Sequence, residues 1–264
     1  MAKIELDKYY TNVELAKYCI NKTFEIIGKE NITEIIEPSA GNGSFSLQID
    51  NCIAYDIKPE HESIMEQDYL ELELEYKKGR LFIGNPPFGS HSGNMAKQFY
   101  KKNIKEGDYI AYILPISQFN NNVELFDFDL IYSENLTNLK YSGVDVHCCF
   151  NIYKRPLNEL NKKPKFELKD INFNIHVRGR KTQENFNNSH IRICAFGSVG
   201  KSCKFPNQYC KEFLIDINNE NLKEKIIEVI KNANWKKEYV MASPYSLTKW
   251  QVVKYLKKMI PEIE

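Results

Sequence analysis

Short apolar runs alternate with helical segments through the first half of the chain, and this alternation restricts the fold more than any other feature. Runs typical of buried strands lie at residues 32–36, 52–57, 80–83 and 109–114, and residues 144–153 are a further strand candidate. Residues 11–14 read as a capping box that begins at Thr11, and apolar residues then follow helical spacing until Gly28. Helical character returns near residues 44–48 and over 94–104. The pattern predicts an α/β fold with a mostly parallel sheet and crossover helices.

The pattern changes after a polar segment at residues 157–165, which contains Pro164 and is typical of a linker. Strands are predicted beyond it at residues 166–178, 190–196 and 213–217, with long polar connections, followed by helices near 220–232 and 247–259. We therefore expect two domains, residues 1–156 and a smaller α+β domain at residues 157–264.

The net charge of +1 conceals an asymmetry between the two parts of the chain. Residues 1–160 hold 16 basic and 24 acidic residues, whereas residues 161–264 hold 20 basic and 11 acidic ones. A basic region beside an acidic one indicates a module that binds a polyanion, although solvated lysines would give the same composition. No run approaches the ~20 apolar residues of a membrane span, and the N-terminus lacks a signal core. With seven cysteines and no C-x-x-C pair, we expect free thiols, no metal and a cytoplasmic protein that does not associate with membranes.

The first chemical motif is the loop Glu-Pro-Ser-Ala-Gly-Asn-Gly-Ser, which begins at Glu37 directly after the first predicted strand. Glycines at a strand-to-helix turn let the backbone approach a ligand, and an acid at the end of the next strand, Asp56, can hold ribose hydroxyls. The loop begins with an acid and lacks the third glycine of the dinucleotide fingerprint, which disfavours the pyrophosphate of NAD. S-adenosylmethionine carries cationic groups that favour nearby carboxylates, and Asp68, after the following strand, could accept a hydrogen bond from its adenine.

The second motif is Asn85-Pro86-Pro87-Phe88, which follows the strand predicted at residues 80–83. Two prolines stiffen the loop and remove N–H donors. An Asn side-chain oxygen beside a fixed Pro carbonyl makes a clamp with two acceptors for an exocyclic NH2 group, and the aromatic ring can stack on the plane that bears the amine.

With these motifs in this order, the sequence resembles the amino-methyltransferases, most closely the DNA adenine-N6 group with its γ arrangement. The resemblance covers about residues 8–155. It implies a Rossmann-like class I methyltransferase domain, S-adenosylmethionine as cofactor, and base flipping before transfer to adenine N6. It also implies double-stranded DNA as partner, a target-recognition role for the C-terminal domain, and a cognate restriction enzyme in a restriction-modification system.

The resemblance implies a role for each matching residue. Tyr10 and Thr11 would close over the methionine part of the cofactor, and Glu37 would face its amino group. The remaining cofactor contacts would come from the turn and from the two following loops: Ala40, Gly41, Gly43, Asp56, Asp68 and Tyr69. Asn85 and the Pro86 carbonyl would bind the target amine, with Pro87 stiffening the loop, Phe88 stacked on the base and Phe150 at its other edge.

The basic residues of the second domain are candidates for DNA contact. Arginines in or beside its loops could read guanine edges, and lysines would mostly meet phosphates. The candidates are Arg178, Arg180, Lys181, Arg192, Lys201 and Lys204.

Other functions remain open from the residues alone. RNA adenine and protein glutamine also present a planar NH2 group to a methyltransferase. A nucleic-acid-binding subunit without catalytic activity could also keep the fold.

The second domain holds two other candidate motifs. Residues 195–202 superficially match a phosphate-binding loop, but the residues that follow do not look helical, which favours a Gly-rich hairpin. His190, Cys194, Cys203 and Cys210 could bind Zn²⁺, yet their spacing fits no standard pattern.

Overall fold

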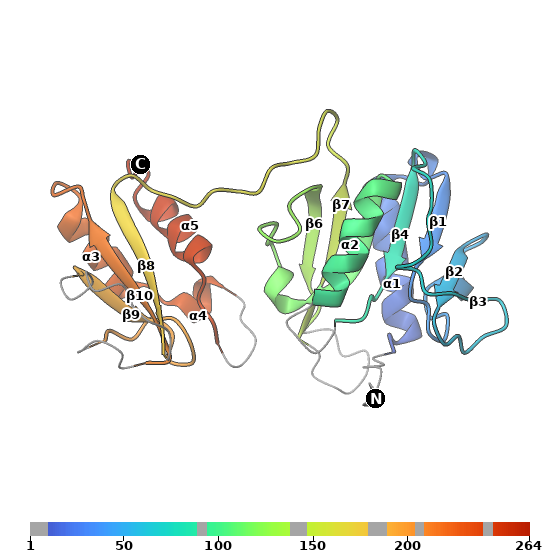
Figure 1. Ribbon diagram of the computed structural model, residues 1–264, viewed down its shortest axis with the longest axis horizontal. Helices are drawn as coiled ribbons and strands as arrows, with labels where there is room; N and C mark the ends of the chain where they lie inside the picture. The colour runs from blue at the N-terminus through green and yellow to red at the C-terminus, as the bar shows by residue number, and fades with distance from the viewer. Residues whose placement is uncertain (1–9, 89–93, 138–146, 179–188, 204–208, 240–244) are drawn as a thin grey trace. The chain divides into compact units, whose positions relative to one another are not determined.

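The computed structural model describes residues 10–88, 94–137, 147–178, 189–203, 209–239 and 245–264. The chain divides into two compact units, Met1–Pro164 and Lys165–Glu264 (Figure 1). The division falls within the predicted linker, where residues 157–165 form neither helix nor strand.

The first unit is an α/β unit built on one sheet. Its strands are β1 Glu34–Glu37, β2 Ile53–Asp56, β3 Met65–Glu66, β4 Arg80–Gly84, β5 Tyr109–Pro115, β6 Asp129–Asn135 and β7 Cys148–Lys154. Its helices are α1 Val13–Ile27 and α2 Asn94–Glu106, with short 3-10 turns at Lys29–Asn31, Ser46–Gln48 and Ile116–Gln118.

The seven strands of this sheet lie in the order β3-β2-β1-β4-β5-β7-β6. Neighbours from β3 to β5 pair in parallel, whereas β7 runs antiparallel to both β5 and β6. This arrangement confirms the predicted Rossmann-like class I methyltransferase fold. The chain leaves β1 toward β2 and β3 on one side and later returns to β4 and β5 on the other, so the switch point lies between β1 and β4.

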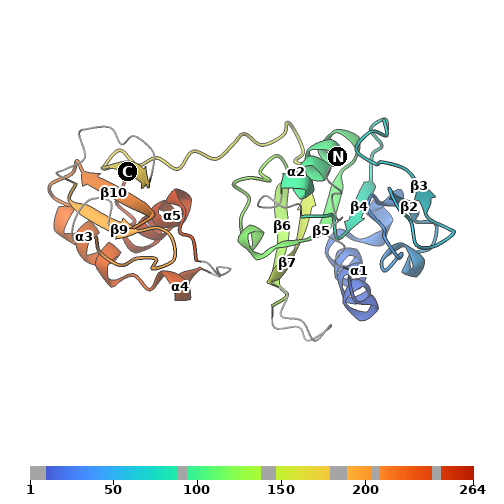
Figure 2. The ribbon, with the colours of Figure 1, turned by 60° about the horizontal axis from the view of Figure 1, so that its bottom comes forward.

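Helices cover both faces of the sheet, as Figures 1 and 2 show. Apolar residues of α1, such as Ala16 and Ile20, share one core with Leu81 of β4 and Ile113 of β5. Those of α2 share a second core with the neighbouring strand residues, among them Phe82 and Ile110. Adjacent residues of β4 thus point into different cores, which explains why this strand reads as a continuous apolar run.

Several predicted boundaries shift. Helix α1 begins one residue later than the capping box implied: Asn12 is its N-cap and accepts from the Glu14 amide, so the prediction for Thr11 was wrong. Strand β1 begins at Glu34 because residues 29–31 form a 3-10 turn. Strand β6 was not predicted, and its Leu130, Tyr132 and Glu134 are only partly buried.

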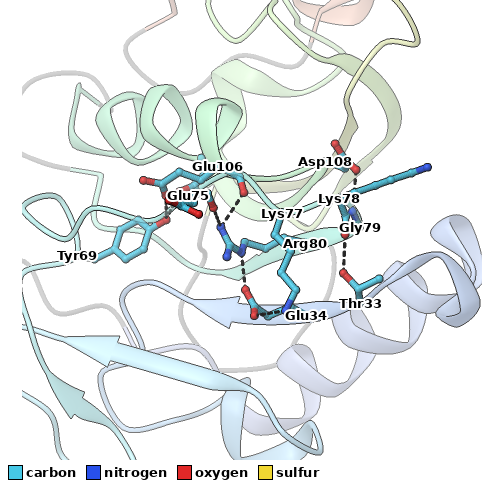
Figure 3. A network of polar contacts seen from close by, with 11 residues as sticks. Thr33, Glu34, Tyr69, Glu75, Lys77, Lys78, Gly79, Arg80, Glu106 and Asp108 are labelled. Carbon is cyan, nitrogen blue, oxygen red and sulfur yellow. Dashed lines mark hydrogen bonds and ion pairs between the residues drawn. The ribbon is translucent and has the colours of Figure 1, made fainter.

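A polar network ties together the amino ends of the strands, opposite the edge where the predicted cofactor loops lie (Figure 3). Arg80 opens β4, is 7% exposed, and donates to the Glu34 carboxylate and to the carbonyls of Glu75 and Glu106. Burial alone would raise the pKa of Glu34, but the hydrogen bonds from Lys77 and Arg80 bring that pKa below its usual value. The network therefore stabilises the fold at neutral pH and loses strength in acid as Glu34 takes up a proton.

The second unit has an antiparallel sheet in the order β8-β10-β9, formed by β8 Ile171–Val177, β9 Ile191–Cys194 and β10 Lys211–Ile217. Its helices are α3 Lys223–Asn232, α4 Trp235–Glu238 and α5 Lys249–Met259. The sheet and the helices share one apolar core, to which Phe213, Ile226 and Leu256 contribute. The predicted smaller α+β fold is confirmed, with α4 as an element that the sequence did not indicate.

Every cysteine of the chain is a free thiol, as expected. Across the residues that the structure describes, no helix combines the length and the apolar character that crossing a bilayer requires.

Candidate functional site

A cavity of about 220 Å³ lies at the carboxyl ends of β1, β2 and β4, at the switch point of the sheet. Open α/β sheets bind ligands at this place because loops from strands on both sides of the switch point diverge there. Glu37 ends β1, Asp56 ends β2, and Asn85 follows β4, so three separate loops bring polar groups to one cavity.

The cavity unites most of the residues predicted from sequence. The predicted residues that line it are Tyr10, Thr11, Glu37, Ala40, Gly41, Asp56, Asp68, Tyr69, Asn85, Pro86, Pro87 and Phe88.

Glu37 supplies a buried carboxylate at the back of this cavity. Its side chain is 2% exposed, and one carboxylate oxygen, Oε2, accepts from the Ser46 amide at 2.8 Å. Burial raises the pKa of Glu37 to about 8, the nearby Asp56 adds to the rise, and the Ser46 hydrogen bond opposes it. A carboxyl group in this state gains most from a cation placed beside it, since the cation would restore the charged form.

The glycine turn is held in shape by Asp56. One carboxylate oxygen accepts from the Gly41 amide and the other from the Lys58 amide, both at 2.8 Å. Gly41 has φ of 55°, and a Cβ there would lie 3.5 Å from the ring of Tyr10. Tyr10 thus covers the turn, and its hydroxyl bonds to Glu60.

Gly43 forms part of the turn, as expected, but it does not line the cavity. It has φ of 81°, and a Cβ at this position would lie 2.7 Å from Leu47. Gly43 is absent from the cavity lining, so it shapes the turn from behind instead of facing a ligand.

The loop after β3 contributes Asp68 and Tyr69, which lie in contrasting surroundings. Asp68 is exposed and accepts from the Leu70 amide. Tyr69 is 1% exposed, and its hydroxyl donates to Asn103 and Glu106 in the core. The hydroxyl of Tyr69 is thus engaged in the core, and its ring stacks on Phe99, another cavity residue, with centroids 5.7 Å apart.

The Asn-Pro-Pro-Phe loop begins immediately after Gly84, the last residue of β4. The amide nitrogen of Asn85 donates to the Thr11 hydroxyl at 3.2 Å, which directs the amide oxygen to the opposite branch of the side chain. Thr11 is fixed in turn, because Ser44 Oγ donates to its carbonyl at 2.7 Å. Gly84 has φ of 144°, and a Cβ there would lie 3.3 Å from Cγ of Glu37. The Asn85 loop and the buried acid therefore pack directly together.

Phe150 does not take part in the cavity. It is fully buried in β7, pairs with Ile113 and packs in the core beneath α1. The predicted contact with a base is wrong, because the register of β7 turns this ring into the core instead of toward the loops.

Ser39, Met95 and Phe99 are among the cavity residues that were not predicted from the sequence. The Ser39 hydroxyl lines the cavity and, within the described residues, is buried without a hydrogen-bond partner. Met95 and Phe99 line it from α2. Met95 and Phe99 lie four residues apart, the spacing of one helix face, which was the signal available for them. Ser39 lies within the Glu37 loop, but no role was predicted for it.

Of the predicted DNA contacts of the second unit, the three that the structure describes lie on different elements. Arg178 is exposed just after β8, whereas Arg192 is half-buried on β9, at the opposite edge of the sheet. Lys201 is exposed in the turn after β9. Arg180, Lys181 and Lys204 lie outside the described residues.

The Gly-rich segment after β9 forms a turn and returns antiparallel. Gly200 and Cys203 donate to the carbonyls of Cys194 and Arg192, and no helix follows within residues 201–203. This supports the hairpin over the phosphate-binding loop. Among the described residues, no group of His, Cys, Asp or Glu has the geometry to hold a metal ion, and His190 Nδ1 accepts from the Ile217 amide.

No family model matches the sequence, and a search of curated proteins found no match. Several solved structures are similar to part of this chain. A protein from Thermoplasma acidophilum is 18% identical over 59% of this chain and 93% of its own, with a TM-score of 0.45. A protein from Pyrococcus horikoshii, proposed to be an RNA methyltransferase, is 15% identical over 60% of this chain and 91% of its own, with a TM-score of 0.45. The magnesium protoporphyrin IX methyltransferase of Synechocystis, solved with bound S-adenosylmethionine, is 10% identical over 58% of this chain and 88% of its own, with a TM-score of 0.40.

Proposed function

We propose that the protein is an S-adenosylmethionine-dependent methyltransferase that modifies adenine N6 in double-stranded DNA. The observation that carries the proposal is that Glu37 and Asn85 share one cavity, with the Asn85 amide held by Thr11. One residue suits the cationic part of a cofactor and the other suits an amine substrate.

The cavity fits S-adenosylmethionine on three observations. The buried Glu37 carboxyl, with its raised pKa, suits the ammonium of the methionine part. The Ser39 hydroxyl lies two residues after Glu37, lines the cavity and has no hydrogen-bond partner among the described residues, so it can form a further hydrogen bond to the cofactor. Asp56, at the end of β2, keeps lone pairs for ribose hydroxyls beyond the two backbone amides that it already accepts. When bound, the cofactor supplies an electrophilic methyl group on its sulfonium.

The Asn85 loop is suited to hold an exocyclic amine. Because the Asn85 nitrogen is turned toward Thr11, the oxygen can accept one amine hydrogen while the Pro86 carbonyl accepts the other. Two acceptors draw the hydrogens out of the ring plane and leave the nitrogen lone pair directed at the methyl group. Phe88 lines the cavity and is partly buried against the core that includes α1. Core contacts therefore hold the residue in place while its ring stacks on a base.

DNA is favoured over a peptide by the charge of the second unit. Residues 165–264 hold 18 basic and 11 acidic residues. A flipped base requires the duplex to be held on both sides of the extruded nucleotide, and basic surface provides that hold.

Transfer of a labelled methyl group to duplex DNA, RNA and peptide in parallel, followed by nucleoside analysis, tests the proposal. We expect label in duplex DNA as N6-methyladenine, formed about 10²–10³ times more slowly with Asn85→Ala. Label found only in RNA adenine, or only in peptide glutamine, would show that this molecule and not duplex DNA is the substrate. Absence of label in all three would refute methyl transfer.

A further inference from the structure

Several lysines lie together on the outer surface of α4 and α5, and none of them is among the DNA contacts predicted from the sequence. It comprises Lys236 and Lys237 on α4 and Lys254, Lys257 and Lys258 on α5, all exposed, together with the half-buried Trp250. Val252, Val253 and Leu256 turn the other side of α5 into the core. Positions 250, 254, 257 and 258 recur at helical spacing, so they form one stripe along the outer side of α5. We refer to these six residues as the α4/α5 surface.

Aromatic packing fixes the position of this surface. The Trp250 ring packs against Tyr239, just after α4, with centroids 5.9 Å apart, and against Phe166 at 6.2 Å. Lys254 Nζ lies 5.8 Å from the centroid of Trp250. Lys258 pairs with Glu238 of α4 at 3.0 Å, which joins the two helices. The ammonium groups are therefore displayed on a rigid support.

The charge of this surface is poorly compensated. Residues 235–259 contain six lysines and a single acid, Glu238, which Lys258 already engages. Within the part of the chain that the structure describes, no carboxylate pairs with Lys254 or Lys257. Lysines three and four residues apart repel one another on a helix.

Helix α3 of the same unit shows the contrasting arrangement. It alternates lysines with Glu224 and Glu228, while Lys223 pairs with Glu220 and Lys225 with Glu262. Two lysines of α3 are thus neutralised by carboxylates, whereas Lys258 is the one lysine of the α4/α5 surface with such a partner among the described residues.

We infer that the α4/α5 surface binds the phosphate backbone of double-stranded DNA, and this inference rests on the proposed function. A polyanion relieves the repulsion among these lysines, and each phosphate that they neutralise releases counterions. Lysines contact phosphates without reading bases, so this surface would hold the duplex irrespective of sequence. Recognition of a sequence would then come from other residues.

The test measures binding of a fluorescent duplex to the full-length protein by anisotropy across a salt series. The variant Lys254→Glu/Lys257→Glu is compared with Lys225→Glu/Lys231→Glu, which makes the same charge change on α3. We expect the α5 variant to lose at least about 30-fold in affinity and to reduce the salt slope by about 2, near 0.9 for each lost contact. The α3 variant should lose less than about 3-fold, and Lys254→Arg/Lys257→Arg should bind as the wild type does. Thermal melting and cofactor binding of each variant confirm that it folds.

Each outcome decides the inference. Equal losses in the α5 and α3 variants would show an effect of net charge alone and overturn it, as would an α5 variant that binds like the wild type. Wild-type protein that binds structured RNA or anionic vesicles but no duplex would also overturn it. The methyl-transfer assay keeps the proposed function separate: if the α5 variant methylates DNA with unchanged KM, only the surface is wrong, whereas no transfer by wild type refutes the function itself.

Discussion

Binding of S-adenosylmethionine should depend on pH through Glu37. The carboxyl has a pKa of about 8 in the free protein, so it is mostly protonated at pH 6–7. An ammonium beside it favours the charged form, and binding must then release a proton. If the pKa in the complex returns to its ordinary value, affinity rises about tenfold, or about 1.4 kcal/mol, between pH 6 and pH 7. Nearer pH 8 the ligand amino group titrates, which limits the rise.

Calorimetry in buffers of different ionisation enthalpy measures both quantities. At pH 7 we expect release of about 0.9 proton per cofactor bound. Glu37→Gln should bind more weakly and remove both the proton release and the pH dependence. 5′-Methylthioadenosine, which lacks the ammonium, is the matched ligand control and should bind with no pH dependence in this range. Equal proton release by wild type and Glu37→Gln would refute the reasoning.

The raised pKa of Glu37 also predicts how the free energy of unfolding of the cofactor-free protein changes with pH. A raised carboxyl pKa means that the folded protein holds the proton more tightly than the unfolded chain does. Its stabilising effect is therefore present in acid and is lost as pH rises toward and through 8. Glu37→Gln, which cannot ionise, should gain stability relative to wild type at pH 9, on the order of 2–5 kcal/mol, and little at pH 5. Urea unfolding of the cofactor-free proteins measures the difference, and a constant offset across pH would contradict it.

Three further predictions concern the Asn85 loop and the opposite edge of the sheet. Asn85→Ala should lower kcat by about 10²–10³ with cofactor Kd unchanged, and near-normal turnover would exclude the clamp. Thr11→Val removes the acceptor for the Asn85 amide and should lower kcat by about 10- to 100-fold, while Thr11→Ser should restore it; no rescue by Ser would argue that the methyl group matters instead. Arg80→Met should lower the free energy of unfolding by about 3–5 kcal/mol, and combining it with Glu34→Gln should cost less than the sum of the two single changes in denaturant melts.

The sequence predicted the architecture where local pattern and burial agree. Strands β4 and β5 are buried along nearly their whole length, so their apolar runs identify them within a residue or two. Strand β6 was not predicted because it lies at the edge of the sheet. Partly exposed polar residues are tolerated there, so the strand has no continuous apolar run. Helix α4 is a short turn and has too few residues for a periodic signal.

For the site, motifs identified residues whose chemistry is tied to type and spacing, such as Glu37 and Asn85. They could not assign roles that depend on side-chain direction. Tyr69 follows Asp68 in sequence, yet its hydroxyl enters the core because Asn103 and Glu106 offer buried partners there. Phe150 lies in a strand whose two faces are both buried, so alternation could not tell which side it faces. The bond from Asn85 to Thr11 spans 74 positions and has no local signature.

Gly84 places a constraint on how such a site can change over evolutionary time. The backbone at Gly84 has φ of 144°, which other residues rarely adopt, a Cβ there would press on Cγ of Glu37 at 3.3 Å, and the next residue is Asn85. A larger residue at this point would disturb both the acid proposed to face the cofactor and the amide proposed to face the substrate. The two binding functions therefore cannot be retuned independently through this strand end. Adaptation to a new amine is open instead at Met95 and Phe99, which reach the cavity from a separate helix and leave the packing of Gly84 against Glu37 untouched.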